Sequence, residues 1–131
     1  PMILDECMDS IHTLMRGFND SAMDVVNLKI NRIGGLTASR LFRDLCIKMG
    51  ITMTIEDSWG GDIATAAIAH LAHSTPSEFH FQSSAFHEYT NLKIASGGPV
   101  IKDGYMSVTD SPGLGVEANM DALGEAIFIS Q

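Results

Sequence analysis

Five charged residues follow short apolar runs at regular intervals along the first half of the chain. The pairs Asp5-Glu6 and Glu56-Asp57 each close such a run, and Lys29 closes the run between them. The interval is 24 residues from Asp5 to Lys29 and 27 residues from Lys29 to Glu56. Carboxylates can hold a divalent cation, and a lysine beside them can move a proton. Taken alone, Lys29 also fits a structural lysine that is ion-paired or snorkels to solvent, and both interpretations stay open at this point.

The elements that would position these residues alternate between strand and helix. The sequence predicts strands at 2–4, 25–30, 51–55 and 79–82, and helices at 8–18, 37–49 and 63–73. This alternation indicates parallel βα units, which occur in doubly wound sheets and in TIM barrels. No Gly-x-Gly-x-x-Gly motif follows a predicted strand, which argues against a dinucleotide-binding fold. Polar residues at the carboxyl ends of the strands favour the rim of a TIM-type barrel.

Strand alternation predicts which side chains share a face. Asn27 and Lys29 lie on one face of the second strand, and Thr54 and Glu56 lie on the polar face of the third. A mixed polar face on an otherwise apolar strand is typical of the mouth of a barrel lumen. We therefore expect the charged residues of all three strand ends to converge at one rim of a partial barrel.

Composition and charge limit the classes of function. The chain has 131 residues, of which 16 are acidic and 8 are basic, and a formal net charge of −8. It is long enough for one domain and has no basic patch for nucleic acid. No apolar run approaches the roughly 20 residues of a membrane span, and no signal peptide is visible. We expect a cytoplasmic protein with Cys7 and Cys46 as reduced thiols within helices, and a chain that begins in mid-fold, because Pro1 runs directly into a strand.

Three stretches together resemble the enolase superfamily, and within it the mandelate racemase/muconate lactonizing enzyme family on its lysine-base side. They are Ile3-Leu4-Asp5-Glu6, then Asn27-Leu28-Lys29 with Arg32-Ile33-Gly34-Gly35, then Glu56-Asp57-Ser58-Trp59-Gly60-Gly61-Asp62 with His70-Leu71-Ala72. Their order and spacing, rather than any single motif, carry the resemblance. The resemblance implies that magnesium holds a substrate carboxylate while a lysine removes the proton alpha to it. The outcome in such enzymes is racemisation, epimerisation, cycloisomerisation or dehydration.

The resemblance also implies roles for individual residues. Asp5 matches the third magnesium-binding carboxylate, at the end of the fifth barrel strand, and Lys29 matches the acid/base lysine of the sixth. Glu56 and Asp57 close the seventh strand and, with Trp59, are expected to bind substrate. The residues expected to support these groups without touching substrate are Glu6, Asn27 and Arg32. Trp59 either offers a cation–π face to an ammonium substrate or packs over the barrel rim.

Several parts of the family pattern are not in this sequence. It has no Lys-x-Lys of the second strand, neither of the first two metal carboxylates, and no N-terminal capping domain. The resemblance therefore implies an α/β fold in which residues 1–90 form strands five to eight of a TIM-type barrel. Residues 91–131 are expected to form a hairpin, signalled by Asp103-Gly104, and a tail that packs on the barrel or cap. Metal binding and two-base chemistry are then incomplete within these 131 residues.

The stretch 57–62 most resembles enzymes that act on proline derivatives, namely hydroxyproline or proline betaine epimerases and cis-3-hydroxyproline dehydratases. The stretch 83–87 carries no acidic pair, which argues against dipeptide epimerisation, and His87 within it either contacts substrate or packs. We expect Mg²⁺ as cofactor, a small-molecule carboxylate as substrate, and as partners the missing N-terminal half and further copies of the intact enzyme. Nucleic acid and membranes are not expected partners. Two alternatives stay open: a truncated, inactive fragment of such an enzyme, or an unrelated α/β binding module.

Local sequence patterns predict four further features. Asp62 is expected to cap the third helix, and Glu6 is expected to point away from Asp5, as adjacent strand residues do. In the tail, we predict a short helix at 119–123 and an extended piece at 126–129.

Overall fold

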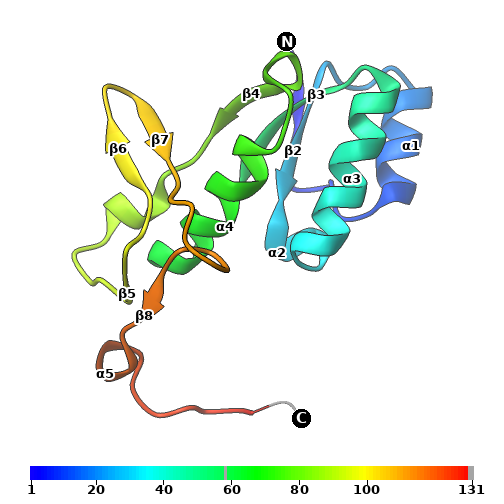
Figure 1. The fold of residues 1–131 in the computed structure, drawn as a ribbon. Helices are drawn as coiled ribbons and strands as arrows, with labels where there is room; N and C mark the ends of the chain where they lie inside the picture. Colours follow the sequence, from blue (N-terminus) through cyan, green and yellow to red (C-terminus); the bar gives the residue numbers. More distant parts are fainter. Residues whose placement is uncertain (58, 130–131) are drawn as a thin grey trace.

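The first part of the chain forms a parallel β-sheet. The computed structural model describes residues 1–57 and 59–129. The sheet has four strands in the order β1-β2-β3-β4, and each neighbouring pair is parallel (Figure 1). The strands are β1 (Ile3–Leu4), β2 (Val25–Lys29), β3 (Thr52–Glu56) and β4 (His80–Ser83), and a 3₁₀ turn, η1 (Ser77–Phe79), precedes β4.

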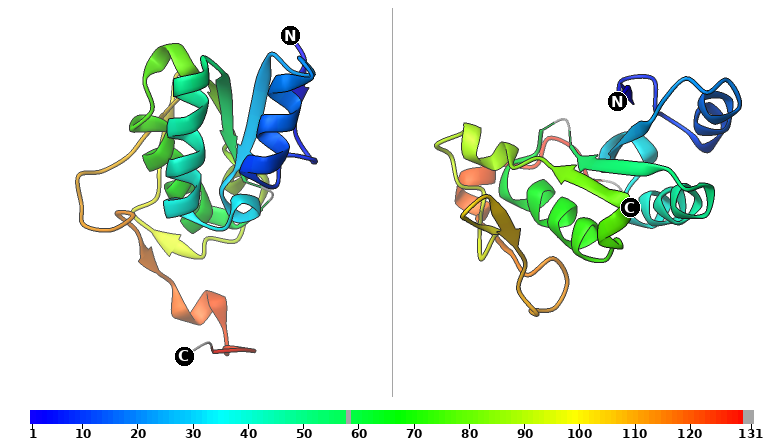
Figure 2. Two further views of the ribbon diagram at one scale, coloured as in Figure 1. Left: turned by 90° about the vertical axis from the view of Figure 1, so that its right-hand side faces the viewer. Right: turned by 90° about the horizontal axis from the view of Figure 1, so that it is seen from above.

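Helices connect the strands and cover one face of the sheet (Figure 2). They are α1 (Ile11–Asn19), the single turn α2 (Ile30–Ile33), α3 (Leu36–Met49) and α4 (Gly61–His73). Parallel crossovers are almost always right-handed, so a strand order that never reverses keeps the connecting helices on one side. A doubly wound sheet requires a reversal of strand order, and the order β1-β2-β3-β4 contains none. The sheet is therefore singly wound, as in a TIM-type barrel.

The hydrophobic core lies between the helices and one face of the sheet. The strands contribute Val26, Leu28, Met53 and Ile55, and the helices contribute Leu14, Phe42, Cys46 and Ile68, all of them buried. The predicted alternation is confirmed, because these four strand residues face the helices. The opposite face carries the polar residues of both strands, and this face would line a barrel lumen.

The first helix begins later than the sequence predicts. The Ser10 side chain caps it by accepting a hydrogen bond from the Thr13 amide at 3.2 Å, so the helix starts at Ile11. Cys7 was expected within this helix and instead lies in an exposed turn before it. Cys46 does lie in a helix and is buried.

The prediction that Asp62 caps the third helix is wrong. Gly60 is the N-cap residue of α4, and Gly60 and Gly61 adopt φ angles of 144° and 58° that glycine tolerates best. Asp62 lies in the first helical turn with 4% of its surface exposed. It accepts hydrogen bonds from the Ile94 amide at 3.0 Å and from Lys93 Nζ at 3.2 Å. Asp62 therefore ties the segment after the sheet to the start of α4.

The predicted hairpin is confirmed in the tail. Its strands pair in an antiparallel manner, and Asp103 and Gly104 at the turn have φ angles of 52° and 80°, as a two-residue hairpin turn requires. A second antiparallel pair joins two short strands on either side of the hairpin. These strands are β6 (Val100–Lys102) and β7 (Tyr105–Ser107) in the hairpin, and β5 (Ala95–Ser96) and β8 (Glu117–Ala118) in the second pair.

The end of the chain carries a short helix, α5 (Met120–Leu123), near the predicted position. The Asn119 side chain caps it by accepting a hydrogen bond from the Ala122 amide at 3.2 Å. The extended piece predicted at 126–129 is not a β-strand, and α5 and the following residues extend away from the sheet (Figures 1 and 2). Among the described residues, no helix is both long enough and apolar enough to cross a membrane.

Candidate active site at the carboxyl edge of the sheet

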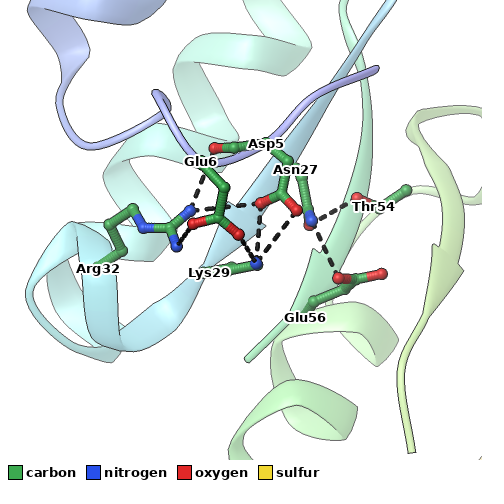
Figure 3. A network of polar contacts seen from close by, with 7 residues as sticks. All are labelled: Asp5, Glu6, Asn27, Lys29, Arg32, Thr54 and Glu56. Atoms are coloured by element: carbon green, nitrogen blue, oxygen red, sulfur yellow. Dashed lines mark hydrogen bonds and ion pairs between the residues drawn. The ribbon is translucent and has the colours of Figure 1, made fainter. Parts of the chain in front are cut away.

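Lys29 is the last residue of β2 and lies at the carboxyl edge of the sheet. Its side chain is 9% exposed and points toward the end of β1 (Figure 3). The Nζ atom lies 2.9 Å from Asp5 Oδ1 and 2.9 Å from Glu6 Oε1. Lys29 is therefore a buried cation held between two carboxylates. This contact fits both interpretations of the lysine, the ion-paired structural one and the acid/base one.

Asp5 and Lys29 stabilise each other's charged forms. Burial alone would raise the pKa of Asp5, but the hydrogen bond from Lys29 and its positive charge hold that pKa below the usual 3.8. Burial alone would lower the pKa of Lys29, but hydrogen bonds to Asp5 and Glu6 raise it above the usual 10.5. In this arrangement Lys29 is an ammonium ion. It must lose this proton before it can accept another, and release from one carboxylate contact makes that loss easier.

Arg32, in α2, forms hydrogen bonds to the loop that follows β1. Its Nη1 donates to the main-chain oxygen of Asp5 at 3.1 Å and to Asp5 Oδ1 at 3.3 Å, and its Nη2 donates to Glu6 Oε2. The prediction that Glu6 points away from Asp5 is wrong, because β1 ends at Leu4 and the chain already turns at Glu6. Strand alternation does not apply there, and both carboxylates face Lys29 and Arg32 (Figure 3).

A second hydrogen-bonded group links β2 to β3. Asn27 and Thr54 are register partners, with 4% and 1% of their surfaces exposed. Thr54 Oγ1 donates to Asn27 Oδ1 at 2.7 Å, and Asn27 Nδ2 donates to Glu56 Oε2 at 2.9 Å (Figure 3). The structure thus brings Glu56 to the same edge as Lys29 and holds its carboxylate through an amide.

The loop after β3 carries an aromatic cluster at the same edge. Trp59 is 64% exposed and stacks on Phe86, with ring centroids 5.4 Å apart, while Tyr89 meets its edge at 6.5 Å. Phe86 and Tyr89 belong to a 3₁₀ helix, η2 (Phe86–Tyr89), just after β4. Asp57, at the start of the Trp59 loop, is buried. Trp59 therefore packs on two rings and still leaves an open face, so neither of its two expected roles is excluded.

Sequence patterns do not identify Phe86 and Tyr89 as part of this edge. Both residues lie in an irregular segment without helical or strand periodicity, and the sole signal is two aromatic residues three positions apart after a strand. His87 between them is 5% exposed, and its Nδ1 has no hydrogen-bond partner among the described residues. The segment after β4 therefore combines an exposed Tyr89 ring with a buried histidine.

Two carboxylates at this edge have the chemistry of divalent metal ligands. Asp5 offers hard carboxylate oxygens, and its side chain is 39% exposed, so a cation can reach it. Glu6 lies beside it with a side chain that is 75% exposed. The described residues contain no group of three or more His, Cys, Asp or Glu side chains that could hold a metal by themselves. Asp5 fits the role of one magnesium ligand among several.

Known enzymes are similar to this chain over almost all of its length. It is 55% identical over 127 residues to cis-3-hydroxy-L-proline dehydratase of Roseibium aggregatum. The aligned residues cover 97% of this chain and 35% of that protein. A crystal structure of a mandelate racemase/muconate lactonizing enzyme from Roseovarius nubinhibens superposes with a TM-score of 0.93 and 40% identity, covering 98% of the chain and 35% of that structure. Another structure from the same organism, complexed with magnesium, has a TM-score of 0.92, 33% identity, and coverage of 98% and 34%.

The chain thus spans 34% to 35% of the length of these relatives. Residues 1–122 match the enolase C-terminal domain-like family. This match excludes the unrelated α/β binding module, and it agrees with the singly wound sheet and its tail hairpin. The chain belongs to the enolase superfamily, in its mandelate racemase/muconate lactonizing enzyme family, and forms the C-terminal half of a TIM-type barrel, strands five to eight, with a hairpin tail.

Proposed function

We propose that this chain is the C-terminal part of a magnesium-dependent enzyme that removes the proton alpha to a substrate carboxylate, with Lys29 as general acid and base. The observation that carries the proposal is the pairing of Lys29 Nζ with Asp5 Oδ1 at 2.9 Å, at the carboxyl ends of adjacent parallel strands. A lysine in reach of a carboxylate at this edge supplies two of the groups that metal-assisted α-proton transfer requires. Such transfer serves racemisation, epimerisation, cycloisomerisation and dehydration alike.

Asp5 is the residue of this chain proposed to hold magnesium. When bound, the cation supplies positive charge that stabilises the negative charge developing on the substrate carboxylate. Arg32 holds Asp5 through both its main-chain and side-chain oxygens, so the carboxylate is oriented before any ligand arrives. The other metal ligands and the second base are proposed to lie in the part of the relatives that this chain does not span.

Lys29 is proposed to carry the proton at its Nζ atom. In the present arrangement it is the acid form, because Asp5 and Glu6 both stabilise the ammonium. If the Asp5 carboxylate turns to another cation, Lys29 keeps only Glu6, which Arg32 also binds. The ammonium then gives up its extra proton to solvent more readily, and the neutral amine can accept the α-proton.

The substrate is proposed to be a proline derivative. Glu56 presents a carboxylate at the edge, and Trp59 offers an exposed indole face, and both attract a cationic ring nitrogen. Asp57 is buried and lies between Glu56 and Trp59 in the sequence. It is proposed to bind the substrate on the same side. The 55% identical relative is named a cis-3-hydroxy-L-proline dehydratase, which favours dehydration of a hydroxylated proline over the other three outcomes.

The setting of the enzyme follows from the same proposal. Residues 1–90 would complete their barrel with an N-terminal half, and residues 91–131 would pack on the barrel or on a capping domain. Met106 and Leu114 of the tail already pack against the core of the half-barrel. We propose a cytoplasmic enzyme that is a homo-oligomer when intact, and a chain of 131 residues that is inactive by itself.

Proton exchange tests the proposed function. The complete polypeptide that contains this chain is incubated in D₂O with magnesium and cis-3-hydroxyproline, proline or proline betaine, and loss of the α-proton is followed by NMR. Lys29→Ala should slow this exchange by about 10²-fold or more in at least one stereochemical direction. Lys48→Ala, which changes an exposed lysine in the last turn of α3, is the matched control. Undiminished exchange by Lys29→Ala in both directions would show that Lys29 is structural.

A further inference from the structure

Lys29 on β2 forms ion pairs with Asp5 and Glu6 rather than with Glu56, its neighbour on β3. Lys29 and Glu56 are register partners on the polar face of adjacent strands, and their charges are opposite. Neighbours of this kind ordinarily attract each other. Yet the ion pairs of Lys29 within the described residues are made with Asp5 and Glu6, on the far side of β2. Some other feature must keep the Glu56 carboxylate away from the ammonium.

Asn27 and Thr54 form that feature. They are register partners that lie two residues before Lys29 and Glu56 on the same two strands. Asn27 Nδ2 donates to Glu56 Oε2 at 2.9 Å, and Thr54 Oγ1 donates to Asn27 Oδ1 at 2.7 Å. Figure 3 shows Asn27 joined to both Thr54 and Glu56, and the Lys29 ammonium joined to Asp5 and Glu6 instead. Because Asn27 and Thr54 are 4% and 1% exposed, water does not compete for these hydrogen bonds.

The orientation of the Asn27 amide is decided by both partners. A carboxylate only accepts hydrogen bonds, so the amide nitrogen must face Glu56 and the amide oxygen must face Thr54. A rotated amide would set its oxygen against the Glu56 carboxylate and leave a buried acceptor without a donor. The Thr54 hydroxyl removes that alternative because it donates to the oxygen in the observed orientation.

We propose that Asn27 and Thr54 are positioning residues that hold the Glu56 carboxylate on the β3 side of the site and thereby keep Lys29 for the carboxylates after β1. Glu56 Oε1, the oxygen that Asn27 does not bind, is then left for a cationic nitrogen of the substrate. This inference rests on the proposed function for its catalytic consequence, but the hydrogen-bonded row itself does not. Loss of the Thr54 hydroxyl would leave the Asn27 amide oxygen without its donor, so that the amide could rotate and release Glu56 toward Lys29.

Three variants of one strand face test the row. Thr54→Val removes the hydroxyl at nearly constant volume, and Thr54→Ser retains it. Thr52→Val makes the same chemical change two residues earlier on the same face, where the threonine hydroxyl makes no hydrogen bond to other described residues. All are made in the complete polypeptide, and thermal unfolding is measured for each, so that loss of folding is separated from loss of positioning.

The first readout does not depend on activity. In NMR spectra the side-chain amide protons of Asn27 should be protected from exchange with water in the unchanged protein, in Thr54→Ser and in Thr52→Val. They should lose protection by roughly tenfold in Thr54→Val, because the amide then lacks the partner that fixes it. Equal protection in Thr54→Val and Thr54→Ser would overturn the proposal. The exchange measurement tests the positioning role even if the protein turns over no substrate. Absence of turnover would count against the proposed function and not against the positioning role.

The second readout is a double-mutant cycle with Glu56→Gln. If Thr54 acts through Glu56, Thr54→Val should raise KM by roughly tenfold in the presence of Glu56 and by less than about twofold once Glu56→Gln is present. Thr54→Ser should restore KM. A purely structural role for Thr54 would give effects that add in the cycle, and that additive result would overturn the proposal.

Discussion

Lys29 Nζ lies 2.9 Å from Asp5 Oδ1, and this ion pair joins the carboxyl ends of β1 and β2 across 24 positions of sequence. The pair places a buried ammonium beside a partly exposed carboxylate, and among the described residues no group of three or more His, Cys, Asp or Glu side chains could hold a metal by itself. Glu6 and Arg32 extend it into a four-residue network. The network gives the chain a charged centre at the carboxyl edge of the sheet.

Asp5→Asn should weaken magnesium binding by the complete polypeptide by about tenfold or more, because the amide carries no charge to attract the cation. Titration calorimetry with MgCl₂ measures this change. Asp110→Asn is the control, since Asp110 lies in an exposed loop of the tail. Equal magnesium affinity in both variants would remove Asp5 from the list of metal ligands.

Arg32→Ala should loosen the loop after β1 while costing roughly 1 kcal/mol or less in unfolding free energy, because Glu6 is mostly solvent-exposed. Hydrogen exchange at the Met8 amide reports on the loop, since this amide donates to the Asp5 main-chain oxygen that Arg32 also binds. Exchange there should accelerate in Arg32→Ala but not in the control Arg40→Ala, which alters an exposed arginine of α3. Unchanged exchange at Met8 would mean that the loop holds its shape without Arg32.

Leu28→Ala should destabilise the fold by about 2–5 kcal/mol, because Leu28 is 0% exposed in the core directly behind the polar face of β2. Leu41→Ala, the same substitution at a position that is 56% exposed on α3, should cost less than about 0.5 kcal/mol. Urea unfolding of the complete polypeptide, monitored by circular dichroism, measures both. Similar costs at the two positions would contradict the assignment of the core.

Cys46 should resist alkylation while the fold is intact. Burial raises the pKa of its thiol to about 12, so almost no reactive thiolate exists at pH 8. Cys7 is exposed and should react with iodoacetamide within the ordinary time course. Mass spectrometry after timed alkylation, with Cys7→Ala to isolate the buried thiol, distinguishes the two. Cys46 is expected to react only when urea unfolds the protein. Rapid reaction without denaturant would show that the helix layer opens readily.

Residues 1–131 produced alone should associate and should not bind magnesium tightly or turn over substrate. Two sheet edges, β1 and β4, are unpaired in the sheet order, and Phe81 on β4 is 53% exposed. Unpaired edges of a parallel sheet are templates for pairing with another chain. Sedimentation and magnesium calorimetry test both points. A stable monomer with micromolar magnesium affinity would contradict the need for a complementary half.

The sequence predicts the polar face of the sheet correctly because strand alternation is a local rule. Asn27 and Lys29 share a face, as do Thr54 and Glu56, whatever the rest of the chain does. The same local reasoning is wrong where an element ends early. Glu6 lies beyond β1 and is not bound by alternation, so it turns to the same side as Asp5.

What the sequence by itself determined is therefore the order of strands and helices, the face on which each strand residue lies, and the resemblance that names the family. Only the tertiary structure decided which charges meet. It paired Lys29 with Asp5 rather than with its register neighbour Glu56, and it brought Trp59 against Phe86 from a separate loop. Such contacts depend on how loops fold over the sheet edge and on which hydrogen-bond donors lie nearby. These are non-local properties, and no periodicity along the chain encodes them.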